Sequence, residues 1–245
     1  MPDRACGRLA VRLTVLKLLR SPAILGASVS LPALVVFVWA RESYEAGLKT
    51  FLYLLPHVFL VATQNMFKGE AAGGALENVL FIRGGFRRYF LWKNAVLSLM
   101  GSGYGLLVFA LIRIIGPGVP EAGPGEPHGL AASLLAGAYY IAIGGLLGHF
   151  LEGGSNVLAL VLAQAAAFIG LIQDAAGGHH FLESLASGTI SGPGERLKFL
   201  ALAGVLPNIL VAGPLRRHAL WLVPAAGALF LLQALIVRGS ESRGR

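Results

Sequence analysis

Cysteine and charge are what this sequence has least of. Of its 245 residues only Cys6 is a cysteine, so no disulfide can form within the chain. Charged residues make up 13%, against about 25% in a typical soluble domain. Hydrophobic residues make up 56%, and the mean hydropathy is +0.70. A water-soluble fold could not bury this much apolar surface, so the sequence predicts an integral membrane protein.

Short alternating segments of about ten residues, the pattern of membrane β-barrels, are also missing. Apolar runs of about 20 residues recur instead, which is the length of a membrane-spanning α-helix. Backbone groups in lipid must find partners inside the protein, so we expect an all-α integral membrane fold. The runs cover residues 22–40, 51–67, 90–115, 130–151, 157–173, 199–215 and 219–237.

A phosphate-binding loop is absent as well. Such a loop needs a Gly-Lys pair to cradle phosphates, and the chain contains no Gly-Lys dipeptide. No ATP hydrolysis by that route is expected on this chain. No Asp or Glu lies in the middle of a predicted span, which disfavours an ion-coupled secondary transporter. The net charge of +8 does not indicate nucleic-acid binding, because no basic domain stands apart from the spans.

Few polar residues in or near the spans suggest chemistry. His149 and Glu152 lie one helical turn apart, a spacing found in metal sites, but no further ligands are evident, so we expect a helix end meeting water. His57 could face either the bundle or a pore. Gln164 is expected to bond a neighbouring helix. The Gly-x-Ser-Gly motif of intramembrane serine proteases is absent, since Met100 precedes Gly101 and Ser102.

The distribution of Lys and Arg predicts the orientation. With six spans and the N-terminus inside, 13 of the 20 basic residues lie on the cytoplasmic side, which fits the positive-inside rule. Residues 4–20 mix five basic residues with leucine and valine and contain no acidic residue. We expect this segment to be an interfacial helix on anionic lipid.

The run 199–215 is the exception among the apolar runs. Pro207 and Asn208 lie in its middle, with Gly204 before them and Gly213 after them. This pattern favours a broken or re-entrant element before the last span, although a kinked crossing helix stays open. The chain is therefore interpreted as a single transmembrane domain, residues 1–245, with about six spans.

One charged, glycine-rich segment separates the second and third apolar runs. It reads GEAAGGALENVLFIRGGFRRYFLWKN from Gly69 to Asn94. Leu76, Val79 and Leu80 form one apolar face of a short helix, which Gly84 and the next glycine end. Basic side chains are then expected at the headgroup level as membrane-interface anchors, where long chains can snorkel to water. These anchors are Arg87, Arg88 and Lys93.

The segment resembles the cytoplasmic loop of ABC type-2 transporter permeases, the membrane subunits of ATP-binding-cassette exporters. The matching features are Lys68-Gly69-Glu70, Gly74-Ala75-Leu76-Glu77, the apolar-basic run 79–83, a turn at 84–85 and Lys93. Ala75 replaces the usual Thr, and Gly84-Gly85 replaces a turn that commonly contains Pro. The resemblance implies that residues 74–83 are a coupling helix that docks into an ATPase. The implied partner-coupling residues are Glu70, Gly74, Leu76, Glu77, Leu80 and Arg83.

The resemblance also implies the partners. The chain would bind no cofactor itself, while separate cytoplasmic ATPase subunits would bind ATP and Mg²⁺. A second permease copy, identical or homologous, would complete the transporter in the plasma (inner) membrane, with both termini cytoplasmic. The alternatives are an ATPase-independent secondary transporter or channel, and an intramembrane enzyme. The transported substrate stays open, because a hydrophobic lining and a lipid-facing surface have the same composition.

Overall fold

The computed structural model describes residues 2–64, 86–115, 125–152, 154–178, 181–211 and 213–243. All regular structure in these ranges is helical, in the order α1, α2, α3, α6, α7, α8, α9, α10, η1, η2 and α11. The α-helices are α1 Pro2–Arg20, α2 Pro22–Arg41, α3 Tyr44–Ala62, α6 Phe86–Ile115, α7 Gly125–Leu147, α8 Ser155–Ala176, α9 Phe181–Ser187, α10 Pro193–Val205 and α11 Leu222–Arg243. The two 3₁₀ helices are η1 Pro207–Val211 and η2 Gly213–Trp221.

Six of these helical segments are long and apolar enough to cross a membrane, among the residues that the structure describes. They are 22–41, 44–62, 88–115, 125–147, 155–176 and 213–237, the last of which joins η2 to α11. The all-α prediction is therefore confirmed for the described residues, and six helices with the length and composition of spans agree with a multi-pass membrane protein. Burial distinguishes the spans, because only 17% of the α2 and α8 windows is buried, against 61% for α7. The outer helices expose leucine, valine and phenylalanine that lipid would cover.

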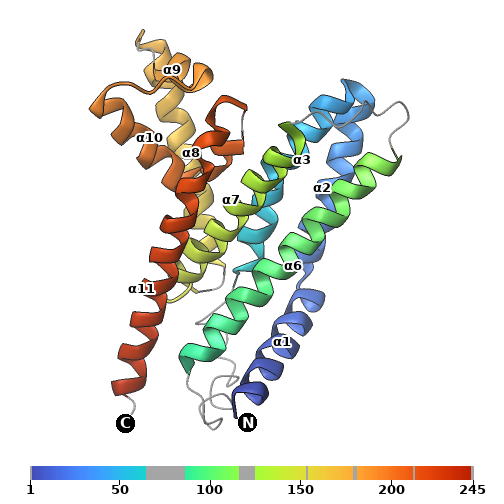
Figure 1. Ribbon diagram of the computed structural model, residues 1–245, viewed down its shortest axis with the longest axis vertical. Coiled ribbons are helices and arrows are strands. Elements are labelled where there is room, and N and C mark those ends of the chain that lie inside the picture. The colour runs from blue at the N-terminus through green and yellow to red at the C-terminus, as the bar shows by residue number, and fades with distance from the viewer. Residues whose placement is uncertain are drawn as a thin grey trace.

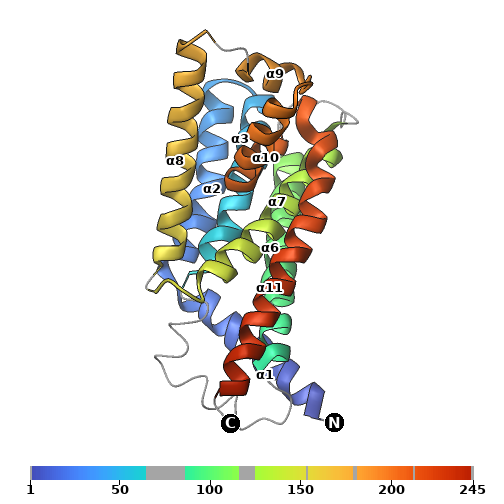
Figure 2. The ribbon, with the colours of Figure 1, turned by 90° about the vertical axis from the view of Figure 1, so that its left-hand side faces the viewer.

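Both chain termini lie at one end of the molecule, together with α1 and the start of α6 (Figure 1). We call this the terminus end. Helices α9 and α10 lie at the opposite end, the far end, and the view turned by 90° shows the same arrangement (Figure 2). The start of α3 and the end of α2 also lie at the far end. Helix α1 packs on α6 and α11 through a small cluster of Ala10, Tyr89, Phe90 and Val237.

Two prolines lie inside spanning helices, and each leaves a backbone carbonyl without its usual helical donor. Pro32 frees the carbonyl of Ser28, which accepts a hydrogen bond from the Tyr104 hydroxyl at 2.6 Å. Pro56 frees the carbonyl of Leu52, which accepts from Ser133 Oγ at 2.7 Å. Side chains of α6 and α7 thus satisfy the carbonyls that these prolines leave in α2 and α3, as an apolar surrounding requires.

Helices α3 and α7 begin before the apolar runs that predicted them. The fourth apolar run begins at residue 130, but α7 already begins at Gly125. Glu126 lies in the first turn, where a negative charge favours a helix, and it pairs with Arg113 at 3.2 Å. Helix α3 begins seven residues before Phe51, because Ser43 caps it by accepting from the Ala46 amide at 3.1 Å.

Candidate functional site

The apolar run with Pro207 at its centre is broken in the structure, as predicted. Helix α10 ends at Val205, Leu206 leaves the helical conformation, and η1 starts at Pro207. A helix end leaves carbonyls without donors, and here they face the protein interior. The Tyr139 hydroxyl donates to the Gly204 carbonyl at 2.8 Å, and Gln164 Nε2 donates to the Val205 carbonyl at 3.3 Å. Side chains of α7 and α8 therefore cap the break.

Four side chains close a ring of hydrogen bonds beside this break, which we call the polar ring: His57, Tyr140, Gln164 and Asn208. Asn208 Nδ2 lies 3.2 Å from His57 Nδ1, and His57 Nε2 lies 3.2 Å from Gln164 Oε1. Gln164 Nε2 donates to the Tyr140 hydroxyl at 2.7 Å, and that hydroxyl donates to Asn208 Oδ1 at 2.7 Å. The ring joins α3, α7, α8 and η1, which are far apart in sequence.

The polar ring has one consistent direction of donation. The Asn208 amide can only donate to His57 Nδ1, so that nitrogen must be the acceptor. His57 then carries its proton on Nε2 and donates it to Gln164, which fixes the neutral tautomer. Asn208 Nδ2 also donates to the Tyr53 carbonyl. Asn208 and Tyr140 are fully buried, so each donor and acceptor used here would be costly to leave unpaired.

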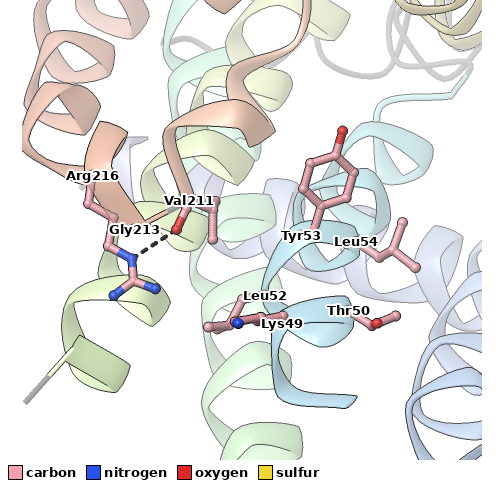
Figure 3. Close-up of a pocket in the computed structure, with 8 residues that line it drawn as sticks. All are labelled: Lys49, Thr50, Leu52, Tyr53, Leu54, Val211, Gly213 and Arg216. Atoms are coloured by element: carbon pink, nitrogen blue, oxygen red, sulfur yellow. Dashed lines mark hydrogen bonds between the residues drawn. The ribbon is translucent and has the colours of Figure 1, made fainter. Parts of the chain in front are cut away.

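A cavity of about 640 Å³ lies on the far-end side of the polar ring. We call it the Lys49–Arg216 cavity. Figure 3 shows its lining, which comes from α3 and from the η1–η2 turn. The lining residues are Lys49, Thr50, Leu52, Tyr53, Leu54, Val211, Gly213 and Arg216. The cavity adjoins the ring, because the Tyr53 carbonyl accepts from Asn208.

Arg216 is half-buried at this cavity. Its Nε donates to the Val211 carbonyl at 2.8 Å, the bond drawn in Figure 3, and Nη1 donates to the Gly125 carbonyl at 2.6 Å. These partners are dipoles and leave the positive charge uncompensated within the described residues. Lys49 is exposed and pairs with Glu45 at 2.7 Å, one turn earlier on α3. The cavity therefore combines an apolar lining with two cations at its far-end margin.

A second buried polar contact, which we call the Asn156 knot, lies toward the terminus end. Asn156 Nδ2, at the start of α8, donates to the Thr63 carbonyl at 3.1 Å, the Thr63 hydroxyl at 3.2 Å and the Gly144 carbonyl at 3.0 Å. Thr63 follows the last residue of α3, and Gly144 lies in α7. The knot thus fixes the terminus-end part of α3 against α7 and α8.

The predicted partner-coupling residues, Glu70 to Arg83, lie outside the described residues, and so do the contacts of the Arg87 side chain. Arg88 is exposed on the first turns of α6. Lys93 was expected to snorkel to the headgroup level, but only 1% of it is exposed. Its ammonium lies 5.9 Å from the Tyr89 ring centre and 5.8 Å from that of Phe90, within cation–π range.

The structure shows the surroundings of the other candidate polar residues. His57 faces the bundle, and Gln164 bonds neighbouring helices as predicted. His149 was expected to meet water, but it is 8% exposed and lies 5.5 Å from the Phe90 ring centre. Burial lowers the pKa of His149 to about 4. No group of three metal-ligating residues occurs in the part of the chain that the structure describes.

Comparison with known proteins adds no relative. No protein-family model, curated protein or solved structure matches the chain.

The sequence indicated His57, Gln164 and Asn208 as separate polar residues but did not predict the polar ring. Tyr140 carried no signal, because a tyrosine in an apolar helix resembles core packing. The one available signal was the coincidence of Pro207, Asn208 and a buried helix end. That end must obtain hydrogen bonds from another helix, which makes polar residues in neighbouring spans its candidate partners.

Proposed function

We propose that this chain is the membrane-spanning permease subunit of an ABC exporter, energised by separate ATPase subunits. The observation that carries the proposal is the position of the two helices that precede and follow the charged segment. Helix α3 ends and α6 begins toward the end of the molecule that holds both termini (Figures 1 and 2). The segment with the Gly74-Ala75-Leu76-Glu77 motif joins these two helices. A partner protein on that side would reach the segment.

The charge distribution supports a cytoplasmic assignment for the terminus end. Helix α1 contributes Arg8, Arg12, Lys17 and Arg20 there, and the first turn of α6 contributes Arg88. For a protein in the plasma membrane, the positive-inside rule would therefore place both termini in the cytoplasm. Residues 4–20 would lie in the headgroup layer of the same leaflet.

The arrangement of α3 supports a mechanism of coupling. One end of this helix continues into residues 65–85, its middle carries His57 of the polar ring, and its other end carries Lys49 and Tyr53. Movement of the ATPase subunits would displace residues 74–83 and with them the terminus end of α3. The helix would transmit this displacement toward the far end, where a substrate would leave. A second copy of the permease would complete the pathway.

Co-purification tests the proposal. The tagged chain is extracted from its native membrane, and an ABC ATPase is identified by mass spectrometry and by vanadate-sensitive ATP hydrolysis. The variant Glu77→Lys should lose most of the bound ATPase, because it reverses a charge in the proposed docking helix. Glu42→Lys is the matched control, because it makes the same change at an exposed residue that follows α2 at the far end. The control should keep the ATPase, and both variants should insert normally.

Two results would contradict parts of this proposal. One is the absence of any ATPase in complexes of the unaltered chain. The other is equal ATPase recovery and equal stimulated hydrolysis in Glu77→Lys and Glu42→Lys. The first result would favour an ATPase-independent transporter or channel, and the second would contradict the coupling role of Glu77.

A further inference from the structure

We propose that the Lys49–Arg216 cavity binds an anionic amphiphile, with its acidic head group between the two cations and its hydrocarbon chain against the apolar lining. As a binding site this stands on the geometry of the cavity alone. That the bound amphiphile is also the exported substrate rests on the proposed exporter function.

The positive charges of Lys49 and Arg216 favour a ligand with an acidic head group. Arg216 bonds only backbone carbonyls among the described residues, so its positive charge can still attract an anion. The exposed pair of Lys49 and Glu45 is weak, since solvent-exposed ion pairs contribute little and exchange readily. An acidic head group can therefore displace Glu45 from Lys49. A cationic ligand would meet two like charges.

The position of the lining residues along α3 favours a ligand with a hydrocarbon chain. Lys49 is the sixth residue of α3, close to the far-end boundary of the span, and Tyr53 lies one turn deeper. His57 lies about 12 Å below Lys49 along the helix axis, at 1.5 Å per residue. Leu52, Leu54 and Val211 provide the apolar lining between these levels. The cavity is thus charged near the membrane surface and apolar deeper in the span. A lipid or a fatty acid in the bilayer has the same arrangement, with its charged head group at the surface and its chain inside.

Size agrees with a small amphiphile. The cavity volume of about 640 Å³ falls within the roughly 300–1,000 Å³ of small-molecule sites. Its hydrogen-bonding side chains besides the two cations are Thr50 and Tyr53, too few to coordinate a sugar polymer. Single-chain acids with a carboxylate, sulfate or phosphate head fit the site best.

A fluorescent fatty acid tests this inference without any ATPase. Dansyl-undecanoic acid is titrated into the purified chain in phosphatidylcholine nanodiscs, and its uncharged methyl ester is titrated in parallel. Binding of the acid should be saturable and at least about tenfold tighter than binding of the ester, which corresponds to about 1.4 kcal/mol. A second set of nanodiscs also contains phosphatidylglycerol. Competition there identifies a membrane lipid as the occupant, and no competition identifies a free amphiphile.

Charge removal at the cavity provides the matched comparison. Lys49→Gln and Arg216→Gln should each weaken binding of the acid by about tenfold and leave the ester unchanged. Lys49→Arg should bind like the unaltered chain. Arg196→Gln is the control, because it removes an exposed far-end charge that lies outside the cavity lining. Lys49 is exposed, so its substitution leaves folding intact even if Arg216→Gln does not fold.

Equal binding of acid and ester, or an unchanged affinity in Lys49→Gln, would overturn the inference. This outcome is separable from failure of the exporter proposal. Loss of the ATPase complex in the co-purification experiment leaves the amphiphile site in place. Loss of amphiphile binding with an intact ATPase complex leaves an exporter of some other substrate.

Discussion

Removal of one oxygen from the polar ring should destabilise the protein measurably. Tyr140→Phe takes away the hydroxyl that accepts from Gln164 and donates to Asn208, both at 2.7 Å. In water-soluble cores a hydrogen bond contributes about 0.5–1.5 kcal/mol. Interhelical bonds in membrane proteins average about 0.6 kcal/mol, because the unfolded chain in the membrane also finds partners. Two bonds at that value give a loss of about 1.2 kcal/mol.

The neighbouring tyrosine gives a matched control. Tyr139 donates one bond, to the Gly204 carbonyl at 2.8 Å, and lies outside the polar ring. Tyr139→Phe should therefore cost about 0.6 kcal/mol. Combination with Asn208→Ala distinguishes the two tyrosines more sharply than the single variants do. Tyr140→Phe should be coupled to Asn208→Ala by about 0.6 kcal/mol or more, whereas Tyr139→Phe should add to it independently.

The assay is unfolding of the purified protein in mixed micelles by increasing sodium dodecyl sulfate, followed by tryptophan fluorescence. The three tryptophans provide the signal, and none belongs to the ring. If Tyr140→Phe and Asn208→Ala are additive within about 0.3 kcal/mol, the two residues do not share a ring in solution. The assignment of the His57 tautomer would then also be lost, because it follows from the same donor order.

Two further predictions concern packing and pH. In Gly144→Ala the new methyl group would collide with the Thr63 hydroxyl, so the variant should lose about 1–3 kcal/mol in the same unfolding assay; Gly103→Ala, which meets open space, should be neutral or slightly stabilising. At the far end, the Ser191 amide holds the pKa of Glu195 below its ordinary value of 4.5. The resulting stabilisation is present above that value and disappears as pH falls through the lower folded pKa. The unaltered chain should lose its advantage over Glu195→Gln below pH 4.5, and a constant difference down to lower pH would contradict this.

Hydropathy predicted the spans but could not predict their places in the bundle. Helix α2 has the higher mean hydropathy, 2.1, and is 17% buried, while α7 has 1.8 and is 61% buried. Lipid and the protein interior are both apolar surroundings. A helix that faces lipid and a helix inside the bundle are therefore built from the same apolar residues. Small residues are the better signal, because Gly137 and Gly144 of α7 allow Phe59 of α3 and Thr63 just after it to lie directly against the α7 backbone.

The break at Pro207 could be predicted because proline acts locally. The partners of that break could not, since they lie 41 to 155 residues away in the chain. The same holds for the carbonyls that Pro32 and Pro56 release: each proline shows where a hydrogen bond is missing. Only the folded bundle shows that Tyr104 and Ser133 replace it.

The position of Pro56 gives Asn208 a role beyond stability. Proline is where α3 can bend, and it separates His57 and the Asn156 knot on one side from Tyr53 and Lys49 on the other. Asn208 bonds both sides of this point, through His57 Nδ1 and the Tyr53 carbonyl. Under the proposed exporter function, a displacement from the terminus end reaches the ring through a rigid part of α3. The two Asn208 bonds would then help to carry the displacement past Pro56. Loss of Asn208 should therefore lower transport by more than it lowers ATPase binding.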